Sequence, residues 1–108
     1  MEFRPPSYFT LAALVDGPLH GYGIMRRARE LSDGSVRVST GTLYSILERA
    51  LAQGLVVSGE SYVVSGRERR DYTLTRAGRD ALVAETERLA EAARVVGAEL
   101  AAATGFAA

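Results

Sequence analysis

Cysteine, lysine and tryptophan are absent from this chain of 108 residues, and histidine occurs once, at His20. Without cysteine the chain has no disulfide bond and no thiolate metal site, which suits a reducing compartment. No apolar run approaches the roughly 18 residues that a membrane-spanning helix needs, and the segment MEFRPPSYF lacks the basic and apolar regions of a signal peptide. These absences predict a cytoplasmic protein that does not contact a membrane.

Groups that perform catalysis are also scarce. The chain has no carboxylate pair at a plausible spacing and no glycine-rich loop that would hold a phosphate. A lone histidine beside glycines is more typical of a helix cap or a turn than of a catalyst. We therefore expect no enzymatic activity, no cofactor and no metal ion.

The charges are present in equal numbers but are unevenly distributed. Thirteen arginines balance thirteen acidic residues, so the net charge is zero. Residues 20–79 hold ten arginines and six acidic residues, a net charge of +4, whereas residues 80–108 carry a net charge of −3. A basic middle followed by an acidic end is the asymmetry that a nucleic-acid-binding segment produces.

Turn residues divide the first half into three helices. Ser7 is a plausible N-cap for a short apolar helix over residues 8–15, which Gly17-Pro18 would end. A second helix is predicted over residues 20–31, with an apolar face of Ile24, Ala28 and Leu31. The third begins at Ser39 or Thr40 and ends at Gln53-Gly54, with a buried stripe of Leu43, Ile46, Leu47, Ala50 and Leu51.

Two strands and a long helix complete the pattern. Residues 55–74 predict two strands joined by a turn at Ser65-Gly66, with Tyr72 and Leu74 on the buried face. Thr75 would cap the last helix and Gly105 would end it. Along that helix, apolar and small residues recur at heptad spacing, which indicates a coiled-coil seam with a second subunit or, alternatively, a seam within the chain. The predicted dimer surface consists of Phe9, Leu82, Leu89, Ala93, Val96 and Leu100.

This order of elements predicts a mainly α fold with a small β component, a winged helix-turn-helix. Residues 1–79 would form a DNA-binding domain and residues 80–108 a C-terminal dimerisation helix. In complexes of helix-turn-helix proteins with DNA, the first turns of the recognition helix enter the major groove. Small polar side chains there reach base edges, and arginines contact phosphates. The helix that begins at Ser39 or Thr40 would have this role. The candidate DNA-binding residues are Tyr22, Arg26, Ser39, Thr40, Gly41, Thr42, Tyr44, Ser45, Arg49, Arg67, Arg69 and Arg70.

Several of these candidates have a structural alternative. Tyr44 is also suited to packing its ring against a neighbouring helix while its hydroxyl stays in water. Arg26 and the arginines near the hairpin tip would be ordinary solvated side chains in another fold.

Four motifs in this order resemble the PadR family of bacterial transcriptional regulators. They are HGYGI (20–24), GTLY (41–44), GLV (54–56) and RRDYTLT (69–75) followed by Ala77-Gly78, and the resemblance covers roughly residues 9–83. It implies a homodimeric repressor that binds an inverted-repeat operator in double-stranded DNA and is released by a small molecule. Members of this family with a single helix after the hairpin form its short-tailed group, and this chain resembles that group.

Two departures from the family pattern affect what the resemblance implies. Asp71 precedes Tyr72 where the family commonly has two tyrosines, so the wing is less positive, and the absence of tryptophan removes the aromatic drug site of some relatives. A small apolar effector between the last helices, lined by Leu82, Leu89, Val96 and Phe9, remains an expectation. The alternative function is a winged-helix module that binds a protein and not DNA.

Overall fold

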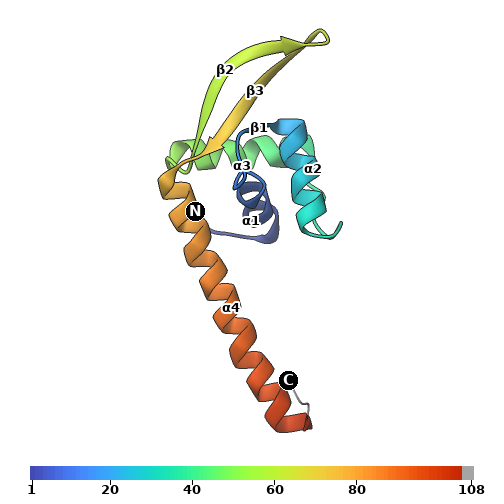
Figure 1. Ribbon diagram of the computed structural model, residues 1–108, viewed down its shortest axis with the longest axis vertical. Helices are drawn as coiled ribbons and strands as arrows, with labels where there is room; N and C mark the ends of the chain where they lie inside the picture. The colour runs from blue at the N-terminus through green and yellow to red at the C-terminus, as the bar shows by residue number, and fades with distance from the viewer. Residues whose placement is uncertain (106–108) are drawn as a thin grey trace.

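The chain forms a winged helix-turn-helix with one long helix after the wing. The computed structural model describes residues 1–105. Its elements are α1 (Pro5–Ala12), β1 (Leu19–His20), α2 (Gly21–Leu31), α3 (Thr40–Ala52), β2 (Val56–Val64), β3 (Arg67–Leu74) and α4 (Arg76–Thr104). The strands form one antiparallel sheet in the order β1-β3-β2. In Figure 1, α1, α2 and α3 lie together, while the β2–β3 ribbon (the wing) and α4 extend from them in different directions. The predicted fold class is confirmed.

The helices begin where a side chain accepts a hydrogen bond from an amide of the first turn, or where prolines occupy that turn. Ser39 Oγ accepts a hydrogen bond from the Thr42 amide at 3.2 Å, and Thr75 Oγ1 accepts one from the Gly78 amide at 3.0 Å, which confirms both predicted caps. The prediction for Ser7 is wrong. Helix α1 begins at Pro5, and Ser7 is buried inside it, because two prolines occupy the first helical positions, where a missing N–H costs nothing.

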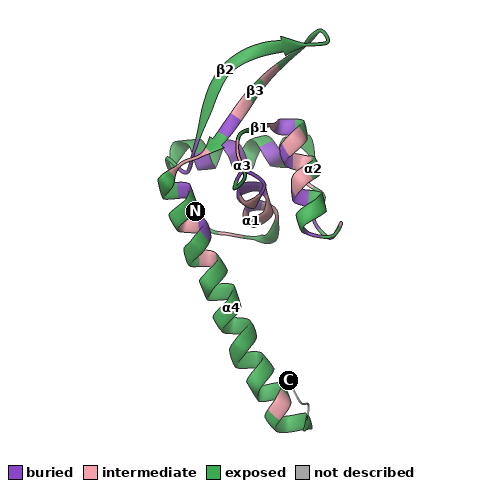
Figure 2. Cartoon of the chain, viewed as in Figure 1, coloured by how far each residue is buried: buried purple, intermediate pink, exposed green. Residues whose placement is uncertain are grey.

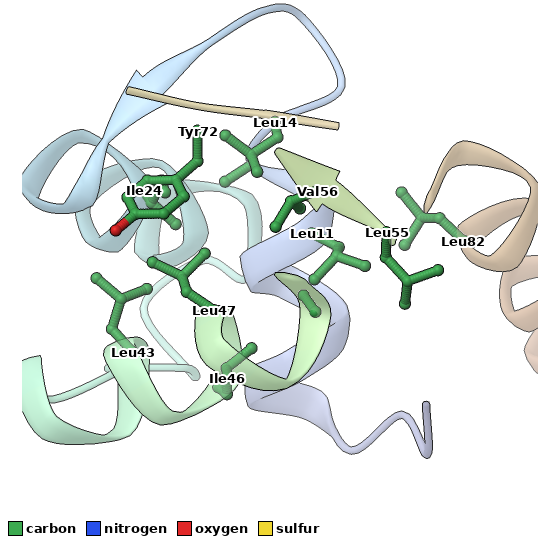
Figure 3. Close-up of a cluster of buried hydrophobic side chains, with 12 residues drawn as sticks. Leu11, Leu14, Ile24, Leu43, Ile46, Leu47, Leu55, Val56, Tyr72 and Leu82 are labelled. Carbon is green, nitrogen blue, oxygen red and sulfur yellow. The ribbon is translucent and has the colours of Figure 1, made fainter. Parts of the chain in front are cut away.

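The core is a single apolar cluster where the three short helices meet the base of the wing (Figure 3). The predicted stripe of α3 is buried from Leu43 to Ala50, but Leu51 is exposed, as is Leu31 of α2. Both residues lie at helix ends, where the surrounding elements no longer cover the side chain. The largest fully buried side chains are Leu11, Leu14, Ile24, Leu43, Ile46, Leu47, Val56 and Thr10.

The wing is a curved hairpin that stands clear of the core. Its turn has positive φ angles at Ser65 (50°) and Gly66 (76°), the conformation that a tight two-residue hairpin turn requires, and this confirms the predicted turn. The pairing shifts between Ser58 and Ser61 of β2. Two residues of β2 therefore oppose one residue of β3, and such a bulge bends the strand that contains it. The bend is visible in Figure 1.

Helix α4 packs on the core by its first turns only. Leu82 is buried in the cluster, and the Tyr8 hydroxyl lies 2.7 Å from Thr86 Oγ1. Beyond this contact the helix is exposed as far as Leu100 (Figure 2). It ends at Gly105, whose φ of 68° confirms the predicted glycine stop. The last three residues of the expected segment 80–108 lie outside the described residues. Within residues 1–105, no helix has the length and hydropathy of a membrane span.

Candidate nucleic-acid interface

The N-terminal tip of α3 presents small polar residues to solvent. Ser39, Thr40, Gly41, Thr42 and Ser45 are all exposed. Ser39 Oγ donates a hydrogen bond to Thr42 Oγ1 at 3.0 Å while it caps the helix. The first turn of a helix also carries free backbone N–H groups and a partial positive charge. The tip therefore offers hydroxyl and amide donors to an anion or to a base edge.

Tyr44 packs against a neighbouring helix and is also partly exposed. Its hydroxyl lies so close to Gly21 of α2 that a Cβ at Gly21 would be 2.8 Å from the oxygen. The glycine thus permits a tight contact between α2 and α3. The Tyr44 side chain is nevertheless 45% exposed, so part of the ring remains accessible. Tyr22 is more exposed, and its ring stacks on that of His20, with centroids 6.4 Å apart.

A groove of about 700 Å³ separates the wing from the N-terminal ends of α2 and α3. The wing bends at the bulge and curves over β1 and the start of α2 (Figure 1), and residues of these elements line the groove. Among the predicted residues, the groove brings together Tyr22, Thr40, Tyr44, Arg67, Arg69 and Arg70. The other candidates of α3 are not part of its lining, and Arg49 lies in the last turn of that helix.

His20 connects the wing to α2. Its Nδ1 accepts a hydrogen bond from the Gly23 amide at 3.1 Å, which confirms the expected capping role. Its Nε2 lies 2.6 Å from Nη1 of Arg69. Arg69 is consequently half-buried, whereas Arg67 and Arg70 are exposed and have no ion pair within residues 1–105. Arg67 and Arg70 are therefore available to bind phosphate.

The acidic residue of the wing has a local partner. Asp71 Oδ1 accepts a hydrogen bond of 2.6 Å from the Tyr62 hydroxyl, and this bond raises the pKa of Tyr62 above its ordinary value. Asp71 pairs with His20 in the sheet, at the base of the wing and away from the tip at Ser65-Gly66. Its charge therefore lies apart from the exposed arginine at the tip, Arg67.

The predicted dimer residues divide into two groups. Leu82 packs in the core of its own chain and Phe9 of α1 is half-buried, whereas Leu89, Val96 and Leu100 are exposed along the projecting part of α4. Ala93 lies on the same exposed stretch. The heptad pattern thus serves an intramolecular contact at its start and leaves an uncovered apolar row beyond it.

Two arginines that were not among the sequence-based candidates lie next to this interface. Arg29 and Arg37 line a shallow surface with Tyr22, Met25 and Arg26. Their sequence positions contained a signal, since Arg29 follows Arg26 by three residues on one helix and Arg37 comes two residues before the cap of α3. Within residues 1–105, no cluster of three or more His, Asp or Glu side chains is arranged to hold a metal ion.

Comparisons with known proteins give one family. Residues 10–84 match the Transcriptional regulator PadR-like family. Transcriptional regulator Rv3488 of Mycobacterium tuberculosis is 48% identical over 82 residues, which cover 76% of this chain and 73% of that protein.

Solved structures agree in fold. A PadR family transcriptional regulator from Eggerthella lenta superposes with a TM-score of 0.70 at 26% identity, covering 87% of this chain and 80% of that one. Bacillus subtilis PadR in complex with operator DNA gives a TM-score of 0.66 at 24% identity, over 77% of this chain and 47% of that one. This chain belongs to the PadR-like family of transcriptional regulators, which are not enzymes.

Proposed function

We propose that this chain is a homodimeric repressor that binds an inverted repeat in double-stranded DNA by inserting the N-terminal tip of α3 into the major groove. One observation carries the proposal: an exposed tip of hydroxyl side chains and free amides lies across a groove from a wing that holds unpaired arginines. Hydroxyls and amides suit base edges, and guanidinium groups suit phosphates. That a neighbour of the same fold was solved with operator DNA is consistent with this role.

The proposed division of labour assigns the reading of bases to Thr42, Ser45 and the accessible part of Tyr44. Arg67 and Arg70 would contact the phosphates of the DNA backbone and so position the protein. Arg69 would contact DNA only after leaving His20, which it touches in this structure. In a dimer, two copies of α3 would enter successive major grooves about 34 Å apart. Residues 1–79 would bind DNA, and residues 80–108 would supply the dimer contact.

The proposed effector site lies beside α4. A hollow of about 230 Å³ is lined by Val15, Arg79, Leu82, Val83, Thr86 and Glu87. Of the four residues expected to line such a site, Leu82 is the one that does so. We expect a small apolar molecule bound here to contact both α4 and the segment that follows α1, and to shift one relative to the other.

The experiment compares variants in an anisotropy titration with duplex DNA from the region upstream of the protein's own gene. Thr42→Ala should reduce the affinity ratio between this DNA and a scrambled duplex. Arg67→Gln should weaken both duplexes alike and lower the salt slope by about 0.9, the value for one phosphate contact. Arg88→Gln, on the exposed part of α4, is the matched charge control. The proposal fails if the wild-type protein binds neither duplex at low salt.

The alternative of a protein-interaction module was suggested by Asp71. Because this carboxylate accepts the Tyr62 hydrogen bond at the base of the wing, it lies apart from Arg67 at the tip, one of the two proposed phosphate-binding residues. Specific capture of a protein partner, together with no retention of DNA at low salt, would favour the alternative.

A further inference from the structure

Two guanidinium groups near α3 have no acidic partner. Within residues 1–105, Arg29 and Arg37 form no ion pair, whereas Arg26 and Arg27 both pair with Glu30, at 3.4 and 3.7 Å. An unpaired arginine keeps its fork of N–H donors for a planar anion such as phosphate. Arg29 and Arg37 are therefore the cations of this surface with free binding capacity.

These arginines lie at the opposite end of the interface from the wing. Helix α2 runs away from the wing in Figure 1, and Arg29 is close to its C-terminal end. The surface is continuous, because Tyr22 and Met25 line both the groove under the wing and the shallow hollow that contains Arg29 and Arg37. The tip of α3 thus has exposed arginines on two sides.

The segment that carries Arg37 is held in place by a buried serine. Ser32 Oγ accepts a hydrogen bond from the Val36 amide at 2.9 Å and donates one to the Arg29 carbonyl at 3.2 Å. The Ser35 hydroxyl donates to the Ser32 carbonyl at 2.8 Å. Because these bonds fix the turn between α2 and α3, the backbone that carries Arg37 is positioned before a ligand arrives, which lowers the entropic cost of binding.

We propose that Arg29 and Arg37 form a second phosphate-binding surface, which grips the DNA strand on the opposite rim of the major groove from the strand that the wing grips. The inference rests on the proposed DNA-binding function. Its geometry follows from the width of the major groove, about 12 Å, since an inserted helix tip has a phosphate backbone on each side. Glu30 does not oppose it, because two arginines already neutralise that carboxylate. Asp33 is the remaining acid that lines the surface.

The test is a salt titration of the double variant Arg29→Gln/Arg37→Gln on a fluorescein-labelled duplex from the protein's own upstream region. Loss of two phosphate contacts should lower the magnitude of the log–log salt slope by about 1.8 and weaken binding roughly tenfold or more at 0.1 M salt. The preference for this duplex over a scrambled one should not change. Arg88→Gln/Arg94→Gln removes the same charge from α4 and should leave the slope unchanged.

Hydroxyl-radical footprinting locates the contacts. The Arg29→Gln/Arg37→Gln variant should lose protection of the DNA along one rim of the major groove. The Arg67→Gln/Arg70→Gln variant should lose protection along the other rim. An unchanged slope, or loss of the same positions by both double variants, overturns the second surface while leaving DNA binding intact. If the wild-type protein does not bind DNA at low salt, the proposed function and this inference are overturned together.

Discussion

His20 stands at a point where two donors compete for one ring. A neutral imidazole has a single acceptor nitrogen, yet Nδ1 faces the Gly23 amide and Nε2 faces the Arg69 guanidinium, and both of these groups donate. The Gly23 cap and a hydrogen bond from Arg69 therefore belong to different tautomers of the ring, which exclude each other. The position of the wing and the N-terminus of α2 are coupled through one proton.

We expect DNA to change the tautomer of His20. When Arg69 turns to a phosphate, the Gly23 cap is the contact that remains, so the population of the tautomer with its proton on Nε2 should rise. Long-range ¹H–¹⁵N correlation spectra can follow this directly, because the chain has one histidine. Arg69→Gln should produce the same spectrum without DNA. Identical ring-nitrogen shifts in the free protein, the complex and the variant would contradict the coupling.

Thr10 offers a test of the core. Its hydroxyl is fully buried and has no hydrogen-bond partner among residues 1–105. Thr10→Val keeps the shape of the side chain and removes the unsatisfied group, so we expect the free energy of unfolding to rise by about 1–2 kcal/mol. Urea denaturation measures the change. Thr73→Val, at an exposed position of β3, should change it by less than about 0.5 kcal/mol.

At the scale of elements, α4 meets the wing through a contact that only glycine permits. A Cβ at Gly78 would lie 2.0 Å from the backbone oxygen of Leu55. The same junction is tied by the Thr75 amide, which donates to Leu55 O at 3.0 Å, and by the Thr75 hydroxyl, which donates to Gly54 O at 2.6 Å. The direction in which α4 leaves the core is therefore fixed at its first turn.

Gly78→Ala should force this junction apart. We expect a loss of about 3 kcal/mol of unfolding free energy, the upper end of the range for overpacked sites. Gly97→Ala is the matched control, because a Cβ there meets open space and should add about 1 kcal/mol through helix propensity. Thermal unfolding of the two variants should shift in opposite directions, and equal shifts would show that the contact is not tight.

The sequence was most informative where a local rule acts alone. Ser39, Thr75 and the Ser65-Gly66 turn were predictable because caps and tight turns depend on a few neighbouring residues. The two-residue strand β1 is too short to show periodicity. The bulge did leave a signal, because an isolated glycine such as Gly59 inside a strand pattern suggests one, but the pairing register that places it depends on the folded sheet. In the described part of the chain, Arg29 and Arg37 are unpaired because Glu30 forms its ion pairs with Arg26 and Arg27. Only the folded chain shows which arginines pair with which carboxylates.

At the scale of the molecule, the exposed row on α4 is the feature that a lone copy leaves uncovered. Leu89→Glu/Val96→Glu should convert the expected dimer to a monomer, because charges would face each other across the seam. Light scattering after gel filtration measures the mass. Ala84→Glu/Ala98→Glu places the same charges on the opposite side of the helix and should leave the mass unchanged. A wild-type mass equal to one chain would remove the dimer from the proposal.

Helix α4 runs without interruption from Arg76 to Thr104, a length of about 43 Å at 1.5 Å per residue. Because the helix is continuous, the orientation of its free end about the helix axis is fixed relative to its packed start. Inserting one residue between its packed start and its free end would turn the end by about 100° relative to the start. In the proposed dimer, the residue count of this helix would set the angle between the two DNA-binding domains. We therefore expect insertions and deletions in α4 to alter which operator spacing is accepted.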